Sequence, residues 1–162
     1  TRLAIFDAHG KPVPPGETGR IFVGNEMRME GYTGGGNKDV IDGLLCSGDV
    51  GHLDEEGRLF IDGRDDEMIV SGGENVFPRE VEDLLAGHGA VKEVAVVGVD
   101  DEEFGQRLKA VIVLNDGAEW SADEVKRFVK ENLAAYKVPR DVEFIDELPR
   151  NATGKILKRE LV

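Results

Sequence analysis

Residues 1–63 show a pattern of short apolar runs separated by tight turns. The apolar runs at 3–6 and 19–24 are bounded by residues that favour turns, so each is predicted to be a strand. Residues 52–61 are predicted to form a hairpin, because the Glu55-Glu-Gly57 turn separates two alternating segments. No helical period extends over more than a turn or two, and we therefore expect this part to be all β.

The pattern changes after residue 63, where helical periods begin to alternate with apolar strands. A helix is predicted at 78–86, because Pro78 suits the first helical position and the aliphatic residues after it form one apolar stripe. A second helix is expected to open at Ser121-Ala-Asp-Glu124, which has the spacing of a capping box. The other predicted elements are strands at 68–70, 94–99, 108–114 and 142–145, a glycine loop at 71–75 and a basic tail helix from 156.

Together the two patterns predict an α+β fold with two parts. Residues 1–64 are expected to be the β-rich, incomplete end of a larger domain. Residues 65–162 are expected to form a small α+β domain with a three-stranded sheet and helices. The chain starts with Thr1 rather than Met, from which we expect it to be a piece of a longer protein.

The charge of the chain argues against some classes of partner. Lys and Arg number 20 against 33 Asp and Glu, which gives a formal net charge of −13 at pH 7. Nucleic acids and anionic membranes require clustered positive charge, so neither is expected as the main partner. The end of the chain reverses the sign, with four basic side chains against one acidic: Arg150, Lys155, Lys158 and Arg159 against Glu160.

Other features narrow the cellular setting. Cys46 is the only cysteine, so no internal disulfide can form and a reducing compartment is expected. No apolar run approaches the length of a membrane span, and no basic and then apolar leader opens the chain. We therefore expect a cytoplasmic protein without a transmembrane segment, with peripheral membrane attachment as the alternative.

The basic end of the chain contains the first candidate for chemistry. In Leu148-Pro-Arg-Asn-Ala-Thr-Gly-Lys155, Gly154 permits a backbone geometry that holds Lys155 out on the tip of a turn. An ammonium group there suits a phosphate or carboxylate anion. The alternative is an ordinary solvated surface lysine. The segment is not a Walker loop, since the first glycine of that motif and the Ser or Thr after its lysine are both missing.

Three further segments combine a polar side chain or a glycine pair with a turn. Asp49, in Ser47-Gly-Asp49, can accept two hydrogen bonds from a ribose diol, or simply cap a turn. Arg64 can donate to ribose or phosphate oxygens, or pair with a neighbouring carboxylate. The Ser71-Gly-Gly-Glu-Asn75 segment permits close approach of a slender ligand, or forms a plain turn before the helix.

These segments occur together, in a fixed order, over nearly the whole chain. The order is Gly-Glu-Thr-Gly-Arg20, Gly31-Tyr32, Ser47-Gly-Asp49, Gly63-Arg64, Ser71-Gly-Gly-Glu-Asn75 and Pro149-Arg-Asn-Ala-Thr-Gly-Lys155. In this order they resemble the C-terminal part of the adenylate-forming acyl-CoA synthetase superfamily, the AMP-binding enzymes. Residues 69–82 are most similar to bacterial fatty-acid-CoA ligases.

The resemblance implies an ATP-dependent acid–thiol ligase of the long- or medium-chain fatty-acid type, acting in lipid metabolism. Such enzymes join a carboxylate to ATP, giving acyl-AMP, and then transfer the acyl group to CoA. The resemblance also implies that residues 65–162 are a mobile lid and that residues 1–64 are the end of the large AMP-binding domain. It implies Mg²⁺ as a cofactor bound outside this chain, and no catalytic activity of the chain alone.

By the same resemblance, particular residues acquire roles. Asp49 and Arg64 match the residues that contact the ribose of ATP or AMP, and Asp66 matches the hinge. Lys155 matches the catalytic lysine that contacts substrate and phosphate oxygens during adenylation, and a lysine acetyltransferase is implied as a partner that modifies it. The residues expected to line the tunnel for the pantetheine and nucleotide of CoA are Ser71, Gly72, Gly73, Glu74, Phe104 and Tyr136.

Other functions stay open at this stage. The chain can instead be a non-catalytic module that binds CoA or a partner protein through residues 149–162. A luciferase-type oxidase shares every motif present. A non-ribosomal adenylation domain is disfavoured, because the chain ends soon after Lys155 without a carrier domain. The acyl pocket is expected upstream of this chain.

Overall fold

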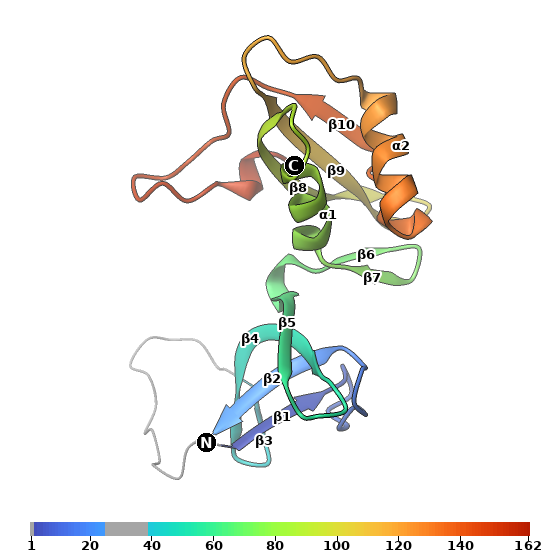
Figure 1. Ribbon diagram of the computed structural model, residues 1–162. Coiled ribbons are helices and arrows are strands. Elements are labelled where there is room, and N and C mark those ends of the chain that lie inside the picture. The colour runs from blue at the N-terminus through green and yellow to red at the C-terminus, as the bar shows by residue number, and fades with distance from the viewer. Residues whose placement is uncertain (1, 25–38) are drawn as a thin grey trace. The chain divides into compact units, whose positions relative to one another are not determined.

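The computed structural model describes residues 2–24 and 39–162, so the Gly31-Tyr32 motif lies outside the described residues (Figure 1). The chain divides into two compact units, Thr1–Asp66 and Glu67–Val162. Each unit contains its own five-stranded sheet, and both α-helices of the described chain belong to the second unit. These elements confirm the mixed α+β fold class.

The first unit is an antiparallel sheet of mostly short strands. Phe6 packs edge-on against Phe22 with ring centroids 5.1 Å apart, in a small core that includes Leu44 and Cys46. The strands follow the order β1-β2-β4-β3, and β5 pairs with β4. They are β1 (Arg2–Phe6), β2 (Gly19–Gly24), β3 (Val40–Ile41), β4 (Leu44–Leu53) and β5 (Leu59–Arg64).

The predicted hairpin in this unit joins β4 to β5 through a turn organised by Asp54. Its Oδ1 accepts hydrogen bonds from the backbone N–H groups of Arg58 and Glu56, at 2.8 and 3.0 Å. The bond from the Arg58 N–H is the main cause that lowers the pKa of Asp54. The register of the hairpin sets Asp49 directly opposite Arg64.

The second unit is a sheet with two helices (Figure 1). Its strands are β6 (Ile69–Ser71), β7 (Glu74–Val76), β8 (Val91–Asp101), β9 (Gly105–Leu114) and β10 (Asp141–Phe144), and its helices are α1 (Pro78–Ala86) and α2 (Ala122–Asn132). The sheet order is β10-β9-β6-β7, and β8 also pairs with β9. All these pairings are antiparallel except that of β10 with β9, which is parallel.

The long β8–β9 hairpin is buried on both of its faces. Alternate residues of the hairpin pack against the two helices, and the remaining ones pack against the C-terminal segment. Because both faces are covered, the strands show nearly continuous apolar runs rather than a polar alternation. The helix-side core includes Val81, Leu85, Val96, Ala110, Ile112, Val125 and Val129, and the opposite core includes Ala95, Val97, Val111, Val113, Leu148 and Leu161.

Both helices form where the sequence predicts them. Pro78 is the first residue of α1. Before α2, Ser121 Oγ accepts a hydrogen bond from Glu124 N–H at 3.2 Å, and Glu124 Oε2 accepts one from Ser121 N–H at 2.8 Å, which completes the capping box. The bond from the Ser121 N–H is the main cause that lowers the pKa of Glu124. Neither helix in the described part of the chain is long and apolar enough to cross a membrane.

The sheet of the second unit is larger than the sequence indicated. Three strands were expected in it, whereas β6 and β7 join β8, β9 and β10 to make five. The predicted glycine loop at 71–75 is the turn of the β6–β7 hairpin. Strands of only three residues are too short to show an alternating pattern, so β7 leaves little trace in the sequence.

The expected basic helix from residue 156 is wrong. Only a 3₁₀ turn, Lys158–Glu160, forms there. Ile156 and Leu161 pack against the sheet on both sides of this turn, which fixes the segment in a less regular path. A helix of so few residues is also marginal on its own, because its nucleation is costly.

Candidate functional site

Lys155 is carried by residues 150–156, which we call the lysine loop. An antiparallel bridge between Arg150 and Ile156 closes the loop at its base. Gly154 adopts a φ of +84°, in a region that residues with a side chain rarely adopt. The loop projects from the second unit as a red segment in Figure 1, and Lys155 is exposed.

The turn of the lysine loop is built around the side chain of Asn151. Its Oδ1 accepts hydrogen bonds from Thr153 N–H at 3.0 Å, Thr153 Oγ1 at 2.7 Å and Lys155 N–H at 2.9 Å. The Asn151 N–H in turn donates to the Lys155 carbonyl oxygen at 2.9 Å. Asparagine favours such side-chain-to-backbone turns. The main chain of Lys155 is therefore fixed while its side chain stays exposed.

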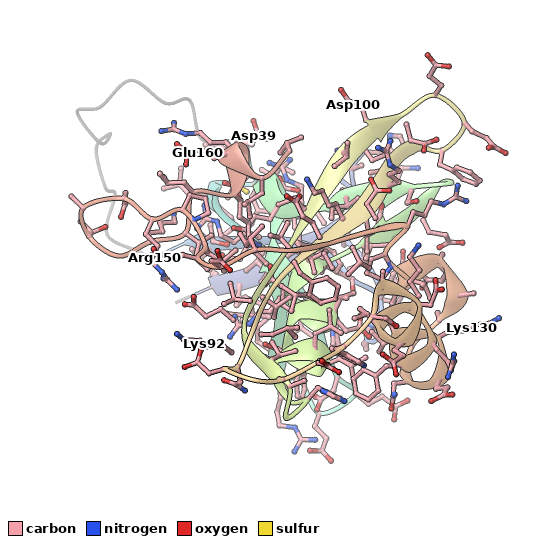
Figure 2. All side chains as sticks on the ribbon, turned by 90° about the horizontal axis from the view of Figure 1, so that it is seen from above. Asp39, Lys92, Asp100, Lys130, Arg150 and Glu160 are labelled. Atoms are coloured by element: carbon pink, nitrogen blue, oxygen red, sulfur yellow. The ribbon has the colours of Figure 1, made fainter. Side chains whose placement is uncertain are left out.

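Arg150 connects this loop to the sheet by a hydrogen bond and an ion pair. Its Nη1 donates a hydrogen bond to the Gly154 carbonyl oxygen at 2.7 Å, and its Nη2 pairs with Glu93 of β8. Figure 2 shows Arg150 at the start of the loop. The sequence pointed to Arg150 only as part of a basic end, and it held no signal for Glu93.

Two of the basic side chains at the end of the chain are paired with carboxylates of the second unit. Arg150 is paired with Glu93, and Lys158 pairs with Glu82 at 2.7 Å. In contrast, Lys155 has no ion pair among the described residues. Its ammonium group is therefore the charge in the loop that remains available to an anionic ligand.

The glycine segment forms a tight turn that packs on the neighbouring hairpin. Gly72 and Gly73 have φ angles of +60° and +82°, and a type I′ hairpin turn requires both to be positive. Gly72 N–H donates to the Phe104 carbonyl oxygen at 2.9 Å, and a Cβ added to Gly72 would lie 3.2 Å from Phe104 Cδ1. The structure therefore brings together five residues expected at the CoA tunnel: Ser71, Gly72, Gly73, Glu74 and Phe104.

Tyr136 is carried by a different element of the second unit. It belongs to the 3₁₀ turn Ala135–Lys137, and it is 42% exposed. The ammonium of Lys137 lies 5.7 Å from the centroid of its ring. No hydrogen bond, ion pair or ring contact within the described ranges joins Tyr136 to Phe104 or to the glycine turn.

Two residues that the sequence did not single out hold Phe104. The guanidinium carbon of Arg140 lies 3.8 Å from the centroid of the Phe104 ring. Asp101 Oδ1 accepts hydrogen bonds from the backbone N–H groups of Phe104 and Glu103, both at 2.9 Å. The bond from Phe104 is the main cause that lowers the pKa of Asp101. An aspartate just before a hairpin turn is a local signal for such a cap, whereas Arg140 offers none.

In the first unit, Asp49 and Arg64 are cross-strand neighbours. They lie directly opposite each other on β4 and β5. The Asp49 N–H donates to Ser47 Oγ at 3.1 Å, and Arg64 Nε donates to Asp66 Oδ1 at 2.9 Å. The structure therefore brings the two expected ribose-binding residues together, with the expected hinge residue bonded to one of them.

A hollow of about 220 Å³ lies beside Arg64 within this unit. At its wall Arg20 forms ion pairs with Asp39 at 2.7 Å and Asp65 at 3.0 Å. The hydrogen bond to Asp39 is the main cause that raises the pKa of Arg20. Arg20 ends one of the motifs in the sequence, yet no role was predicted for it. The lining residues are Arg20, Asp39, Cys46, Gly48, Arg64, Asp65 and Asp66.

The described residues do not offer a metal site. Within residues 2–24 and 39–162, no group of three or more His, Cys, Asp or Glu side chains is placed to hold a metal ion. Mg²⁺ at nucleotide sites is commonly held by one or two carboxylates together with substrate phosphates, and we assign no residue of this chain to that ion.

Comparison with known proteins relates these features to a family. Residues 80–155 match the AMP-binding enzyme C-terminal domain. The chain is 45% identical over 164 residues to a feruloyl-CoA synthase of Amycolatopsis sp, and 42% identical over 166 residues to a long-chain-fatty-acid–CoA ligase of Bacillus subtilis. These alignments cover 99% and 100% of this chain, but 33% and 30% of the two relatives.

A solved structure agrees along nearly the whole chain. The o-succinylbenzoate CoA synthetase of Bacillus subtilis, in complex with its acyl-adenylate intermediate, is similar with a TM-score of 0.87 and 37% identity. The similarity covers 99% of this chain and 33% of that one. The chain thus spans about a third of the length of the relatives it matches. The chain belongs to the family of the AMP-binding enzyme C-terminal domain, which residues 80–155 match.

Proposed function

We propose that this chain is the C-terminal part of an ATP-dependent acid–thiol ligase that forms an acyl-AMP and then a CoA thioester. The observation that carries the proposal is the lysine loop, which presents the exposed Lys155 from a main chain fixed by Asn151. The names of two relatives, a feruloyl-CoA synthase and a fatty-acid–CoA ligase, support the reaction class.

Lys155 is the proposed catalytic residue of adenylation. When a carboxylate attacks the α-phosphate of ATP, negative charge develops on the phosphate oxygens. A positioned ammonium stabilises that charge more in the transition state than in the ground state. Because the loop fixes the peptide of Lys155, the side chain keeps its reach while little backbone order has to be gained during the reaction.

Asp49 and Arg64 are proposed to hold the ribose of ATP. A carboxylate accepts hydrogen bonds from the two hydroxyls of a ribose diol, and a guanidinium donates to ribose or phosphate oxygens. Their cross-strand position supports a shared role, since both can then reach one sugar.

Asp66 is proposed as the hinge between the two catalytic steps, with residues 65–162 moving as a lid. It lies in the 3₁₀ turn Asp65–Glu67, where the first compact unit ends and the second begins. A short turn at a boundary between two compact units is a suitable place to absorb a change in φ and ψ.

The β6–β7 turn is proposed to line the path of the CoA pantetheine arm. Gly72 and Gly73 leave the turn without side chains, so a slender ligand can pass close to the backbone. Phe104 packs against Gly72 and supports that path. Tyr136 is proposed to lie near the CoA nucleotide.

The acid is proposed to be a fatty acid of long or medium chain length. Support comes from the 42% identity to the Bacillus subtilis fatty-acid–CoA ligase, while the feruloyl-CoA synthase makes an aromatic acid the competing substrate class. Because the acyl pocket is expected upstream of this chain, an assay of the full-length protein with fatty and aromatic acids in parallel decides between the two classes. Acetylation of Lys155 by an acetyltransferase stays a prediction, and it would remove the charge that adenylation needs.

The decisive experiment uses a chimera in which this chain replaces the matching third of the Bacillus subtilis o-succinylbenzoate CoA synthetase. Its ATP–pyrophosphate exchange with o-succinylbenzoate reports adenylation, and CoA thioester formation from the supplied acyl-adenylate reports the second step. Lys155→Ala is expected to lower exchange by about 10²–10³-fold while sparing thioester formation.

Lys130→Ala is the matched control, because Lys130 is an exposed lysine at the end of α2 (Figure 2). It should leave both half-reactions unchanged. A folded chimera without exchange, or an equal loss of both half-reactions in Lys155→Ala, contradicts the proposal. CoA binding without any exchange would instead favour a non-catalytic CoA-binding module.

A further inference from the structure

The peptide bond between Gly154 and Lys155 is held from both sides by side chains. The Gly154 carbonyl oxygen accepts a hydrogen bond from Arg150 Nη1 at 2.7 Å. The Lys155 N–H donates to Asn151 Oδ1 at 2.9 Å. A peptide unit with both polar groups bonded cannot rotate without breaking one of these bonds. Arg150 and Asn151 therefore set the direction in which Lys155 leaves the main chain.

Arg150 is in turn fixed by Glu93, which lies 57 residues earlier in the chain. Glu93 is part of β8, which pairs with β9 along nearly its full length. The ion pair between Arg150 Nη2 and Glu93 Oε1 thus ties the exposed loop to a well-ordered strand. A loop supported by a rigid element can hold a side chain more exactly in place than a free loop.

We propose that Arg150 and Glu93 are positioning residues that aim Lys155 during adenylation. The inference rests on the proposed catalytic role of Lys155. Glu93 holds the guanidinium of Arg150, and Arg150 holds the Gly154 carbonyl, so the peptide before Lys155 keeps one orientation. Neither residue touches the substrate in this arrangement, and both act through the lysine loop.

A role in folding stability alone fits the pair less well. The side chains of Arg150 and Glu93 are 37% and 29% exposed, and ion pairs between partly exposed groups contribute little to folding. The planar guanidinium, however, holds its two acceptors in the fixed geometry of a rigid fork, whereas the ammonium of a lysine has no such fork. The pair is therefore better suited to fixing a direction than to stabilising the unit.

The first test measures backbone NMR order parameters in the 162-residue chain itself. Arg150→Met and Glu93→Gln are expected to lower the values at Gly154 and Lys155 from about 0.85, typical of rigid backbone, to below about 0.6. Glu143→Gln is the matched control, because it removes a carboxylate from another ion pair of the sheet, with Lys109. The control should leave the lysine loop unchanged.

The second test measures both half-reactions in the chimera. In Arg150→Met, acyl-AMP formation is expected to fall about 10- to 100-fold, because a displacement of about 1 Å can cost that much rate. Thioester formation from supplied acyl-adenylate is expected to stay within about twofold, since Lys155 acts in the first step. Arg150→Lys, which keeps a donor but not the fork, should recover part of the adenylation rate.

Exchanging the charges of Arg150 and Glu93 distinguishes positioning of the lysine loop from the effect of the ion pair alone. The double variant Glu93→Arg with Arg150→Glu restores opposite charges, but a glutamate at 150 cannot donate to the Gly154 carbonyl. We expect it to keep the unfolding midpoint of the unaltered chain and still to form acyl-AMP slowly. Full recovery of adenylation in this double variant would overturn the inference.

Two further outcomes also overturn it: unchanged loop order with unchanged adenylation in Arg150→Met, and equal loss of both half-reactions in that variant. The Lys155→Ala variant distinguishes failure of the positioning inference from failure of the proposed function. If Lys155→Ala leaves adenylation intact, the proposed function fails. If Lys155→Ala abolishes adenylation and Arg150→Met does not lower it, only the positioning inference fails.

Discussion

The lysine loop and the β6–β7 turn both contain glycines with positive φ, but the two turns are stabilised by different kinds of interaction. Side chains hold the lysine loop, chiefly the Asn151 amide and the Arg150 guanidinium. The β6–β7 turn is held by main-chain pairing and by contact with Phe104. Two exposed turns of the same unit thus obtain their order from different chemical groups.

This difference matches what each turn presents. The lysine loop presents one side chain, so we expect adenylation to slow when atoms that support the loop are removed. The β6–β7 turn presents a backbone without side chains at its two glycines, so we expect thioester formation and stability to fall when atoms are added there. The two proposed half-reactions can therefore be separated by opposite kinds of substitution.

The largest effect on folding stability is expected from adding a side chain to the β6–β7 turn. In Gly72→Val, a β-branched residue must adopt a φ of +60° and crowd Phe104 Cδ1, 3.2 Å from the new Cβ. Backbone strain of this kind costs about 1–3 kcal/mol. Urea unfolding of the chain should show the loss, and the chimera should lose thioester formation more than adenylation.

Gly73→Val is the matched control for this contact. Gly73 has a similarly positive φ of +82°, but apart from its two neighbours in the chain no described residue has an atom within 4 Å of the position that a Cβ would take there. The control therefore carries the backbone strain without the crowding of Phe104. Equal losses of stability and of thioester formation in the two variants would show that the Phe104 contact has no part in the turn.

An intermediate effect is expected from removing the amide at the centre of the lysine loop. Asn151→Ala deletes the acceptor of three hydrogen bonds, two from Thr153 and one from Lys155. Adenylation should fall about tenfold, which corresponds to about 1.4 kcal/mol in the barrier. Stability should change less than in Gly72→Val, because the loop is exposed and its bonds compete with water.

Asn132→Ala serves as the control for the loss of an asparagine. Asn132 donates one hydrogen bond to Phe128 at the end of α2, outside the lysine loop. Pyrophosphate exchange by the two chimeras gives the comparison. If both variants slow adenylation equally, the effect does not come from the lysine loop.

Local signals in the sequence were sufficient for several elements. The capping box at Ser121 predicted the start of α2, and Pro78 predicted the start of α1, because both act within one helical turn. Lys155 and Gly72 became candidates because a glycine next to a functional group can be recognised within a few residues of sequence. The 3₁₀ turn at Lys158–Glu160 was mistaken for a helix, since packing of the tail against the sheet overrides a basic local pattern.

The partners of these residues could not be found in the same way. Glu93 lies 57 residues from Arg150, and nothing in the sequence around either residue indicates the other. Arg140 meets Phe104 only because β10 lies next to β9 in the sheet. The candidate residues at the tips of turns were therefore predictable, whereas the side chains that support them depend on the tertiary fold.

The smallest effect is expected from acid, and it should separate the lysine loop from the turn between β8 and β9, whose Phe104 contacts the β6–β7 turn. Asp101 accepts the Phe104 N–H, and this bond lowers the pKa of Asp101 in the folded chain. A lowered folded pKa means that the stabilisation is present above the ordinary pKa of a carboxyl group and is lost as the pH falls through the lowered value. The acceptor in the lysine loop is the amide of Asn151, which does not titrate. In an NMR titration, the amide shift of Phe104 should therefore change with a midpoint below the usual range for aspartate, and that change should vanish in Asp101→Asn. The Thr153 amide should show no such transition, and a shared midpoint for Phe104 and Thr153 would mean that both turns respond to one unfolding event rather than to their own acceptors.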